Sequence, residues 1–255
     1  MHSVAHSLRA YAGKDGRGYP DWAVRYAPIV AGLRQRLDLS SARILEIGAN
    51  ANGLARFANT AIIAADISIK SLAEARAARP ITPVAANIAS LPFADGSFDV
   101  CVCVDTYEHV PANSRAVASR EILRVLRPTG VAVVTFPSGK PAEQAEQIIR
   151  DAYRALTGAP LSWLEEHAAE GLPDVDEVAR VFEETGGGAC RVTCTKNATL
   201  WVWLWMWRVL MCNWPGRGNA LFQAALRLVT PVVCRMHFGT CYRAVVWVQC
   251  ETKSR

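Results

Sequence analysis

Two carboxylates and an imidazole follow one short apolar segment of the chain. Residues 100–104 read Val-Cys-Val-Cys-Val, the pattern of a strand buried on both faces, and Asp105, Glu108 and His109 come directly after it. An imidazole titrates near neutrality, so His109 has the chemistry to take a proton from an acceptor hydroxyl. We identify His109 as the candidate general base; the alternative is that it and Glu108 only hold the loop and start the next helix.

The same three side chains offer the donors of a partial site for a hard metal ion. Such a site needs further His or Glu ligands, and none stands nearby in the sequence. We therefore expect no metal at this position. Tyr107 and Glu108 are expected instead to line the pocket for an acceptor substrate.

A strand, a turn of small residues and a second strand must position these groups. Residues 43–47 and 62–66 are short apolar runs typical of buried strands, and Gly48 begins a turn of Gly, Ala and Asn residues between them. Such a βαβ unit brings backbone N–H groups to a polar ligand at a helix N-terminus. Asp66 lies 20 residues after Glu46, where an acid can bind a ribose diol. An ordinary strand-to-helix turn is the alternative.

Strands and helices alternate through most of the remaining chain, which predicts a doubly wound parallel sheet. The expected helices include one capped by Ser68, one over residues 115–127 and one that begins at Asp174. The last two strands, 190–196 and 241–251, are expected to pair as an antiparallel hairpin. The predicted fold class is therefore α/β, with a mostly parallel seven-stranded Rossmann-like sheet and a helical insertion between the last two strands. The expected organisation is an N-terminal segment and helix (1–40), a cofactor-binding core (41–197), the insertion (198–240), and the last strand and tail (241–255).

The insertion concentrates Trp and Arg. The net charge of the chain is +5, yet residues 185–250 hold seven basic residues and no Asp or Glu. Trp201, Trp203, Trp205 and Trp207 lie in a run that is too short to span a bilayer, which needs about 20 apolar residues. We expect residues 198–240 to meet an anionic membrane surface or an apolar acceptor; the alternative is extra core packed on the sheet.

The termini and cysteines indicate a compartment. No apolar signal segment follows Met1, and the eight Cys residues form no CxxC pair. We therefore expect reduced thiols and a cytoplasmic protein, peripheral at the inner membrane face if the insertion binds lipid. No nucleic acid partner is expected.

Five motifs in order resemble the class I S-adenosylmethionine-dependent methyltransferases, and within them the type 11 methyltransferases. The resemblance covers about residues 40–137, and Asn50, Asn52 and Asn87 depart from its usual Gly and Asp residues. The motifs are Ile-Leu-Glu-Ile-Gly (44–48), Ala-Asp-Ile-Ser (65–68), Leu-Pro-Phe-Ala-Asp-Gly-Ser-Phe-Asp (91–99), Glu-His-Val-Pro (108–111) and Leu-Arg-Pro-Thr-Gly (126–130).

The resemblance implies S-adenosylmethionine as the cofactor and assigns roles to its contacts. Asp66 would take the ribose hydroxyls, and Ile67 would pack on the adenine. The methionine part would lie against Glu46 and the turn. One further pair of residues would contact the adenine edge, and another pair would lie near the transferring methyl group. These remaining positions are Gly48, Ala49 and Asn50 in the turn, Asn87 and Ile88 at the adenine edge, and Asp105 and Thr106 near the methyl group.

The function expected from this resemblance is methylation, most simply O-methylation of a hydrophobic, lipid-linked, natural-product or glycan acceptor. The acceptor would be a small molecule or a lipid-linked one. Two alternatives remain: an NAD-dependent oxidoreductase on a Rossmann fold, and a methyltransferase-like binding protein without activity.

Overall fold

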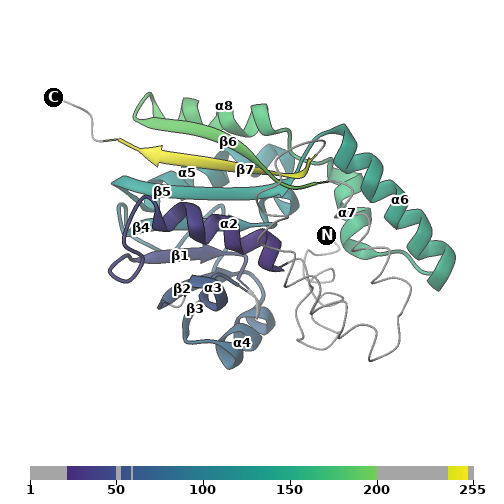
Figure 1. The fold of residues 1–255 in the computed structure, drawn as a ribbon, viewed down its shortest axis with the longest axis horizontal. Coiled ribbons are helices and arrows are strands. Elements are labelled where there is room, and N and C mark those ends of the chain that lie inside the picture. The colour runs from purple at the N-terminus through teal and green to yellow at the C-terminus, as the bar shows by residue number, and fades with distance from the viewer. Residues whose placement is uncertain (1–21, 50–52, 59, 200–240, 252–255) are drawn as a thin grey trace.

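The structure is a seven-stranded sheet flanked by helices (Figure 1). The computed structural model describes residues 22–49, 53–58, 60–199 and 241–251. Its elements are α2 (Trp22–Arg34), β1 (Ile44–Ile47), α3 (Ala55–Ala58), β2 (Ile62–Asp66), α4 (Ile69–Ala78), β3 (Ile81–Ala85), β4 (Phe98–Val104), η1 (Tyr107–His109), η2 (Ala112–Ser114), α5 (Arg115–Val125), β5 (Leu126–Pro137), α6 (Lys140–Thr157), α7 (Ser162–Glu170), α8 (Val175–Gly186), β6 (Cys190–Thr199) and β7 (Cys241–Cys250).

The sheet has the strand order β3-β2-β1-β4-β5-β7-β6. Five strands, β1 to β5, are parallel, whereas β7 is antiparallel to both β5 and β6. The predicted α/β class, the seven strands and the antiparallel hairpin of the last two are therefore confirmed. The order reverses between β1 and β4, and a crevice for ligands opens at such a switch point, outside the carboxyl ends of the strands.

Alternating side chains of the central strands enter two different hydrophobic layers. Leu45 and Ile47 of β1 join the cluster that includes α5 and α8, whereas Ile44 joins the cluster that includes α2 and α3. Because the strands are covered on both faces, they read as continuous apolar runs rather than as alternating ones. This is the reason that the strand positions were readable from the sequence.

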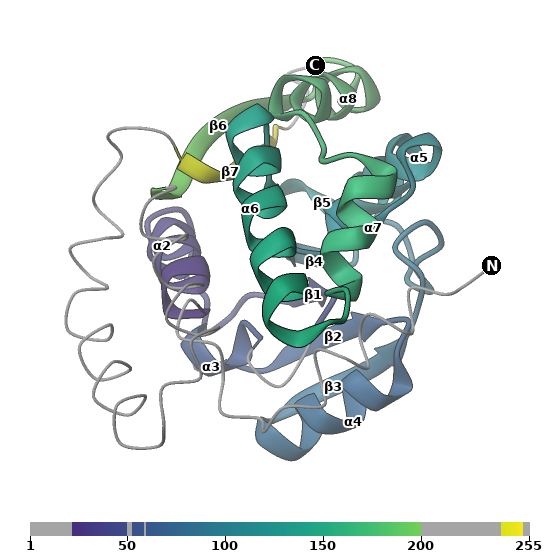
Figure 2. The ribbon, with the colours of Figure 1, turned by 90° about the vertical axis from the view of Figure 1, so that its right-hand side faces the viewer.

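Helices α6 and α7 cover the carboxyl ends of the parallel strands. Figure 1 shows them beyond one end of the sheet, and Figure 2 shows them side by side in front of the strand ends. α6 is strongly amphipathic in sequence: Ala142, Ala145 and Ile149 are buried, while Ile148 is 58% exposed. The two helices therefore bring side chains to the edge where β4 and β5 end.

Two boundaries differ from the sequence expectation. β5 begins at Leu126, inside the helix expected to run to residue 127, because Leu126 pairs with Phe98 of β4 beside a register shift. β6 continues through Thr199, two residues into the expected insertion. The rest of that insertion, including its five Trp residues, lies outside the described residues. Within the described part, no helix is long and apolar enough to cross a membrane.

Candidate functional site

Two glycines at the ends of the turn after β1 have no room for a side chain. Gly48 has a φ of +77°, and a Cβ there would lie 1.8 Å from Thr106 Oγ1. A Cβ on Gly53 would lie 2.6 Å from Glu46 Oε2. Any larger residue at either position would push the turn outward. The turn after β1 thus lies directly against the residue that follows Asp105 at the end of β4.

Glu46 lies under this turn and is 1% exposed. Its Oε1 accepts hydrogen bonds from Tyr26 Oη at 3.0 Å and from the Leu54 N–H at 2.7 Å. Burial raises the pKa of Glu46 to about 7, although both hydrogen bonds act in the opposite direction. Glu46 therefore ties α2 to the start of α3, and its contact with a cofactor stays a prediction.

The other predicted contacts of the turn are only partly described. The backbone N–H groups of Gly48 and Ala49 both point to the carbonyl of Ala65, at 2.8 and 3.4 Å. Both N–H groups thus tie the start of the turn to the end of β2, and the contact of Gly48 and Ala49 with a cofactor stays a prediction. Asn50 lies outside the described residues.

Asp66 ends β2 at the same edge. Its side chain accepts a hydrogen bond from the Ser68 N–H at 2.7 Å, and burial raises its pKa to about 6, against that hydrogen bond. The next residue, Ile67, is 49% exposed although it is apolar. An acid beside an exposed apolar side chain matches what a ribose and an adenine ring require.

The loop after β3 carries the predicted contacts to the adenine edge. Asn87 is exposed, and its Oδ1 accepts a hydrogen bond from the Ala89 N–H at 2.9 Å, which shapes a tight turn. Ile88 is 8% exposed and packs in the core. The contact of Asn87 and Ile88 with the adenine edge stays a prediction.

Asp105, expected near the amino acid end of the cofactor and the methyl group, has a buried carboxylate that pairs with two arginines, and its contact with a cofactor stays a prediction. It accepts from Arg243 Nε and Nη2 at 2.7 and 2.6 Å, from Arg25 Nη1 at 2.5 Å, and from Thr135 Oγ1 at 3.1 Å. Burial acts to raise its pKa, but Arg243 and Arg25 outweigh burial and hold the pKa of Asp105 below its usual value. Asp105 is a structural anion that joins β4 to α2, β5 and β7.

Tyr107, expected to line the acceptor pocket, packs between η1 and α5, and its contact with an acceptor stays a prediction. Its ring is fully buried, and its hydroxyl pairs with the Arg115 carbonyl at 3.1 Å and with Ser119 Oγ at 2.9 Å. The buried Tyr107 therefore anchors η1 to the start of α5. Thr106 keeps its position at the edge, against Gly48.

Glu108 and His109 lie close to His167 of α7, which is far from both in the sequence. The His109 ring lies 4.9 Å from the His167 ring of α7, centroid to centroid. His167 Nδ1 in turn lies 3.0 Å from both carboxylate oxygens of Glu146 on α6. Glu108 is 3% exposed, and burial, helped by the nearby charge of Asp105, raises its pKa.

A polar cluster therefore forms where η1, α6 and α7 converge. The sequence held one weak signal for it, since His167 interrupts the buried face of α7 formed by Trp163 and Leu164. His109, the candidate base, is partly open, with 24% of its side chain exposed, and its Nδ1 lies 3.5 Å from Glu166 Oε2.

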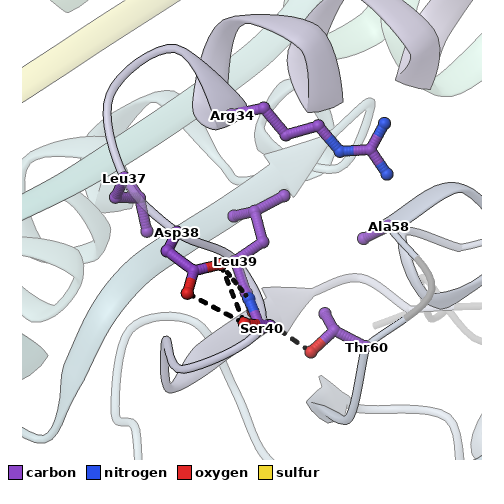
Figure 3. Close-up of a pocket in the computed structure, with 7 residues that line it drawn as sticks. All are labelled: Arg34, Leu37, Asp38, Leu39, Ser40, Ala58 and Thr60. Carbon is purple, nitrogen blue, oxygen red and sulfur yellow. Dashed lines mark hydrogen bonds between the residues drawn. The ribbon is translucent and has the colours of Figure 1, made fainter.

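A separate hollow lies at the opposite edge of the sheet (Figure 3). It has a volume of about 590 Å³ and is lined by the loop between α2 and β1 and by Ala58 and Thr60. Asp38, its one carboxylate, accepts from the Ser40 N–H and hydroxyl and so closes its own turn. Because it adjoins the amino ends of β1 and β2, this hollow is not the predicted cofactor site.

Comparison with known proteins identifies the central part of the chain. Residues 45–134 match the family model described as a methyltransferase domain. A stretch of 53 residues is 51% identical to an uncharacterized methyltransferase of Mycobacterium sp. (strain KMS), covering 21% of this chain and 20% of that relative. The chain thus aligns with about a fifth of the length of the curated relatives it matches.

Solved structures share the whole fold. A chain from the complex between a Haloferax volcanii methyltransferase activator and a putative methyltransferase superposes with a TM-score of 0.62 at 14% identity, covering 99% of this chain and 100% of that one. A Thermotoga maritima S-adenosylmethionine-dependent methyltransferase, described as a possible histamine N-methyltransferase, gives 0.58 at 12% identity, covering 97% and 100%. At such identities the likeness concerns the fold alone.

Proposed function

Residues 45–134 form a methyltransferase domain on the class I S-adenosylmethionine-dependent methyltransferase fold, and from this premise we propose that the protein transfers a methyl group from S-adenosylmethionine to an acceptor hydroxyl. The observation that carries the proposal is the meeting of the matched motifs at one edge. The Gly48 turn contacts Thr106, and Asp66 with the exposed Ile67 ends the neighbouring strand.

The cofactor would lie along the carboxyl ends of β1, β2 and β4. Asp66 would accept hydrogen bonds from the ribose hydroxyls, and Ile67 would pack on the adenine ring, with Asn87 at its edge. The methionine part would lie over the Gly48 turn. The cofactor would supply a methyl group for transfer near the end of β4, where η1 begins.

His109 would then take the proton of the acceptor hydroxyl. Its side chain is partly open at this edge, and its Nδ1 faces Glu166 at 3.5 Å, so an ionised Glu166 would stabilise the imidazolium formed on proton transfer. The acceptor is expected to be hydrophobic or lipid-linked, because the Trp-rich segment 200–240 joins β6 to β7 in the same chain. An anionic membrane surface is the proposed partner of that segment.

Calorimetry with S-adenosylmethionine tests the cofactor assignment. Asp66→Asn removes the charge that would bind the ribose and should weaken binding by about 1.5–3 kcal/mol, roughly 10- to 150-fold. Asp38→Asn, a carboxylate at the opposite edge, is the matched control and should leave the affinity unchanged.

The same experiment separates the alternatives. Binding of NADH in place of S-adenosylmethionine would identify an oxidoreductase and overturn the proposal. Incubation with methyl-labelled S-adenosylmethionine and fractionated cell extract then identifies the acceptor class. Cofactor binding with no label transferred to any fraction would favour a binding protein without activity.

A further inference from the structure

We infer that Glu108, His109 and His167 form a binding site for one divalent transition-metal ion. Each of the three residues offers one ligand atom, and these atoms all lie within 4.8 Å of one another. Two imidazole nitrogens and one carboxylate oxygen are a donor set that such ions favour. The expectation of no metal rested on the absence of nearby ligands in sequence, and α7 supplies one from 58 positions away.

Two of the three ligands carry a buried polar atom with no partner. Glu108 Oε2 and His167 Nε2 are both shielded from solvent and accept or donate no hydrogen bond among the described residues. Their side chains are 3% and 4% exposed. Leaving such atoms unsatisfied costs about 1–3 kcal/mol each, so buried polar groups nearly always have a partner. A bound cation would satisfy both atoms at once.

The surroundings of His167 leave Nε2 as a lone-pair donor. Glu146 accepts the Tyr242 hydroxyl at 2.5 Å and faces His167 Nδ1 at 3.0 Å, which is the pattern of an ionised carboxylate with two donors. Nδ1 then carries the proton, and Nε2 keeps its lone pair. Metal-binding histidines characteristically have such a carboxylate behind the opposite ring nitrogen.

His109 has a similar arrangement on a more exposed side. Its Nδ1 lies 3.5 Å from Glu166 Oε2, so both histidines are backed by a glutamate from α6 or α7. Glu108, Glu146 and Glu166 form no ion pair with Lys or Arg in the part of the chain that the structure describes, although the charge of Arg243 acts on Glu108. Three carboxylates around two imidazoles make the local charge favourable for a cation.

The geometry indicates a site that tightens when the ion binds. Ligand atoms about 2.0–2.2 Å from a tetrahedral zinc lie about 3.3–3.6 Å from one another, somewhat closer than the 4.8 Å limit seen here. Three protein ligands leave at least one position open to water or to a substrate oxygen. The partly exposed His109 marks the side from which that ligand would enter.

This site would serve the proposed methyl transfer by binding the acceptor oxygen. A hydroxyl bound to a divalent ion loses its proton more readily, so the ion would replace His109 as the group that activates the acceptor, and the released proton would pass to solvent water on the open side of the site. The acceptor class that fits is one whose hydroxyl can coordinate a metal. This step rests on the proposed function, whereas the binding of the ion does not.

Metal titration of the full chain, after removal of any histidine tag and treatment with a chelator, tests the site directly. We expect one Zn²⁺ or Co²⁺ per chain, a Co²⁺ absorption spectrum typical of nitrogen and oxygen ligands, and a higher melting temperature with the ion present. Glu108→Gln and His167→Ala should each weaken binding by about 100-fold or more, and Glu146→Gln by about 10- to 100-fold.

Glu165→Gln is the matched control, because Glu165 lies on α7 but pairs with Arg154 at 2.6 Å outside the cluster. It should bind the ion as the unmodified chain does. Circular dichroism of each metal-free variant shows whether it folds, so weakened binding is read only from folded protein. No ion bound to the unmodified chain, or equal affinity in all variants, would overturn the inference and assign the two buried atoms to an enclosed water.

The two proposals fail in different ways. Stoichiometric Co²⁺ binding that depends on His167, without S-adenosylmethionine binding, supports the metal site and contradicts the proposed function. Methyl transfer that proceeds unchanged in His167→Ala, with no Co²⁺ bound by the unmodified chain, supports the function and contradicts the metal site.

Discussion

Replacing Asp105 by Asn should cost the fold a large part of its stability. The carboxylate is buried and is the shared acceptor of Arg25, Arg243 and Thr135. Among the described residues it is the one non-glycine residue with a positive φ, +48°. Asn tolerates that conformation as well as Asp does, so the substitution changes the charge and leaves the backbone preference unaltered.

The expected loss is about 3–5 kcal/mol, because two buried guanidinium groups would remain without their common anion. A domain of this kind is stable by about 5–15 kcal/mol in total, so the variant stays folded but unfolds at a much lower urea concentration. The equivalent shift in melting temperature is about 6–20 °C for a chain of this size. Urea titration followed by circular dichroism measures the loss.

Glu251→Gln is the control, since Glu251 pairs with Arg191 on the exposed surface and should contribute at most about 1 kcal/mol. The acid side gives a second check. Because the pKa of Asp105 is lowered by folding, its contribution is present above the unfolded pKa of about 3.9 and disappears as the pH falls below it. The free energies of unfolding of the unmodified chain and of Asp105→Asn should therefore become equal in strong acid. A loss below about 1 kcal/mol at neutral pH would refute the structural role of this anion.

Three further predictions concern Glu46, Gly48 and the segment of residues 200–240. Folding raises the pKa of Glu46 to about 7, so between pH 4.5 and 7 the native state holds a proton that the unfolded chain releases. The free energy of unfolding should therefore fall by about 3 kcal/mol across this pH range. Calorimetry should show a weaker dependence of this free energy on pH for Glu46→Gln. Gly48→Ala should weaken S-adenosylmethionine binding at least about 10-fold, because its Cβ would collide with Thr106, whereas Gly158→Ala carries the same backbone strain in open space and should leave affinity intact. If residues 200–240 bind the membrane surface, the protein should sediment with anionic liposomes at low salt and stay in the supernatant at high salt. Protein that stays in the supernatant at low salt contradicts that proposal.

The sheet could be predicted from the sequence because its strands are buried on both faces. Apolar runs such as 43–47 and 131–136 have no other stable place in a chain of this length. Local chemistry also placed some helix ends: Ser68 caps α4 through Ser71, and Asp174 caps α8 through the N–H groups of the first turn. The end of α5 was placed too late, because the pairing of Leu126 with Phe98 is not a local property.

The partners of Asp105 and His109 could not be predicted in the same way. Arg243 is separated from Asp105 by 138 residues, and only the placement of β7 beside β5 brings them together. His167 belongs to a helix whose position over the strand ends has no pattern in the sequence. Motifs locate the groups that recur after each strand, whereas the contacts between helices and strand ends depend on the complete topology.

The pairing of Thr199 with Cys241 has a consequence for how freely the chain can be edited. The polypeptide leaves the sheet and returns to it at directly opposite positions, so replacing the 41 residues between them need not move either end of the hairpin. Replacing them by a five-residue turn would lower the entropic cost of closing this hairpin by about 2 kcal/mol. The register of β6 against β7 would then be maintained by the strands alone. A chain shortened in this way, or carrying a foreign segment at the same place, would keep the carboxyl ends of β1, β2 and β4 and so separate the proposed cofactor site from the contribution of residues 200–240.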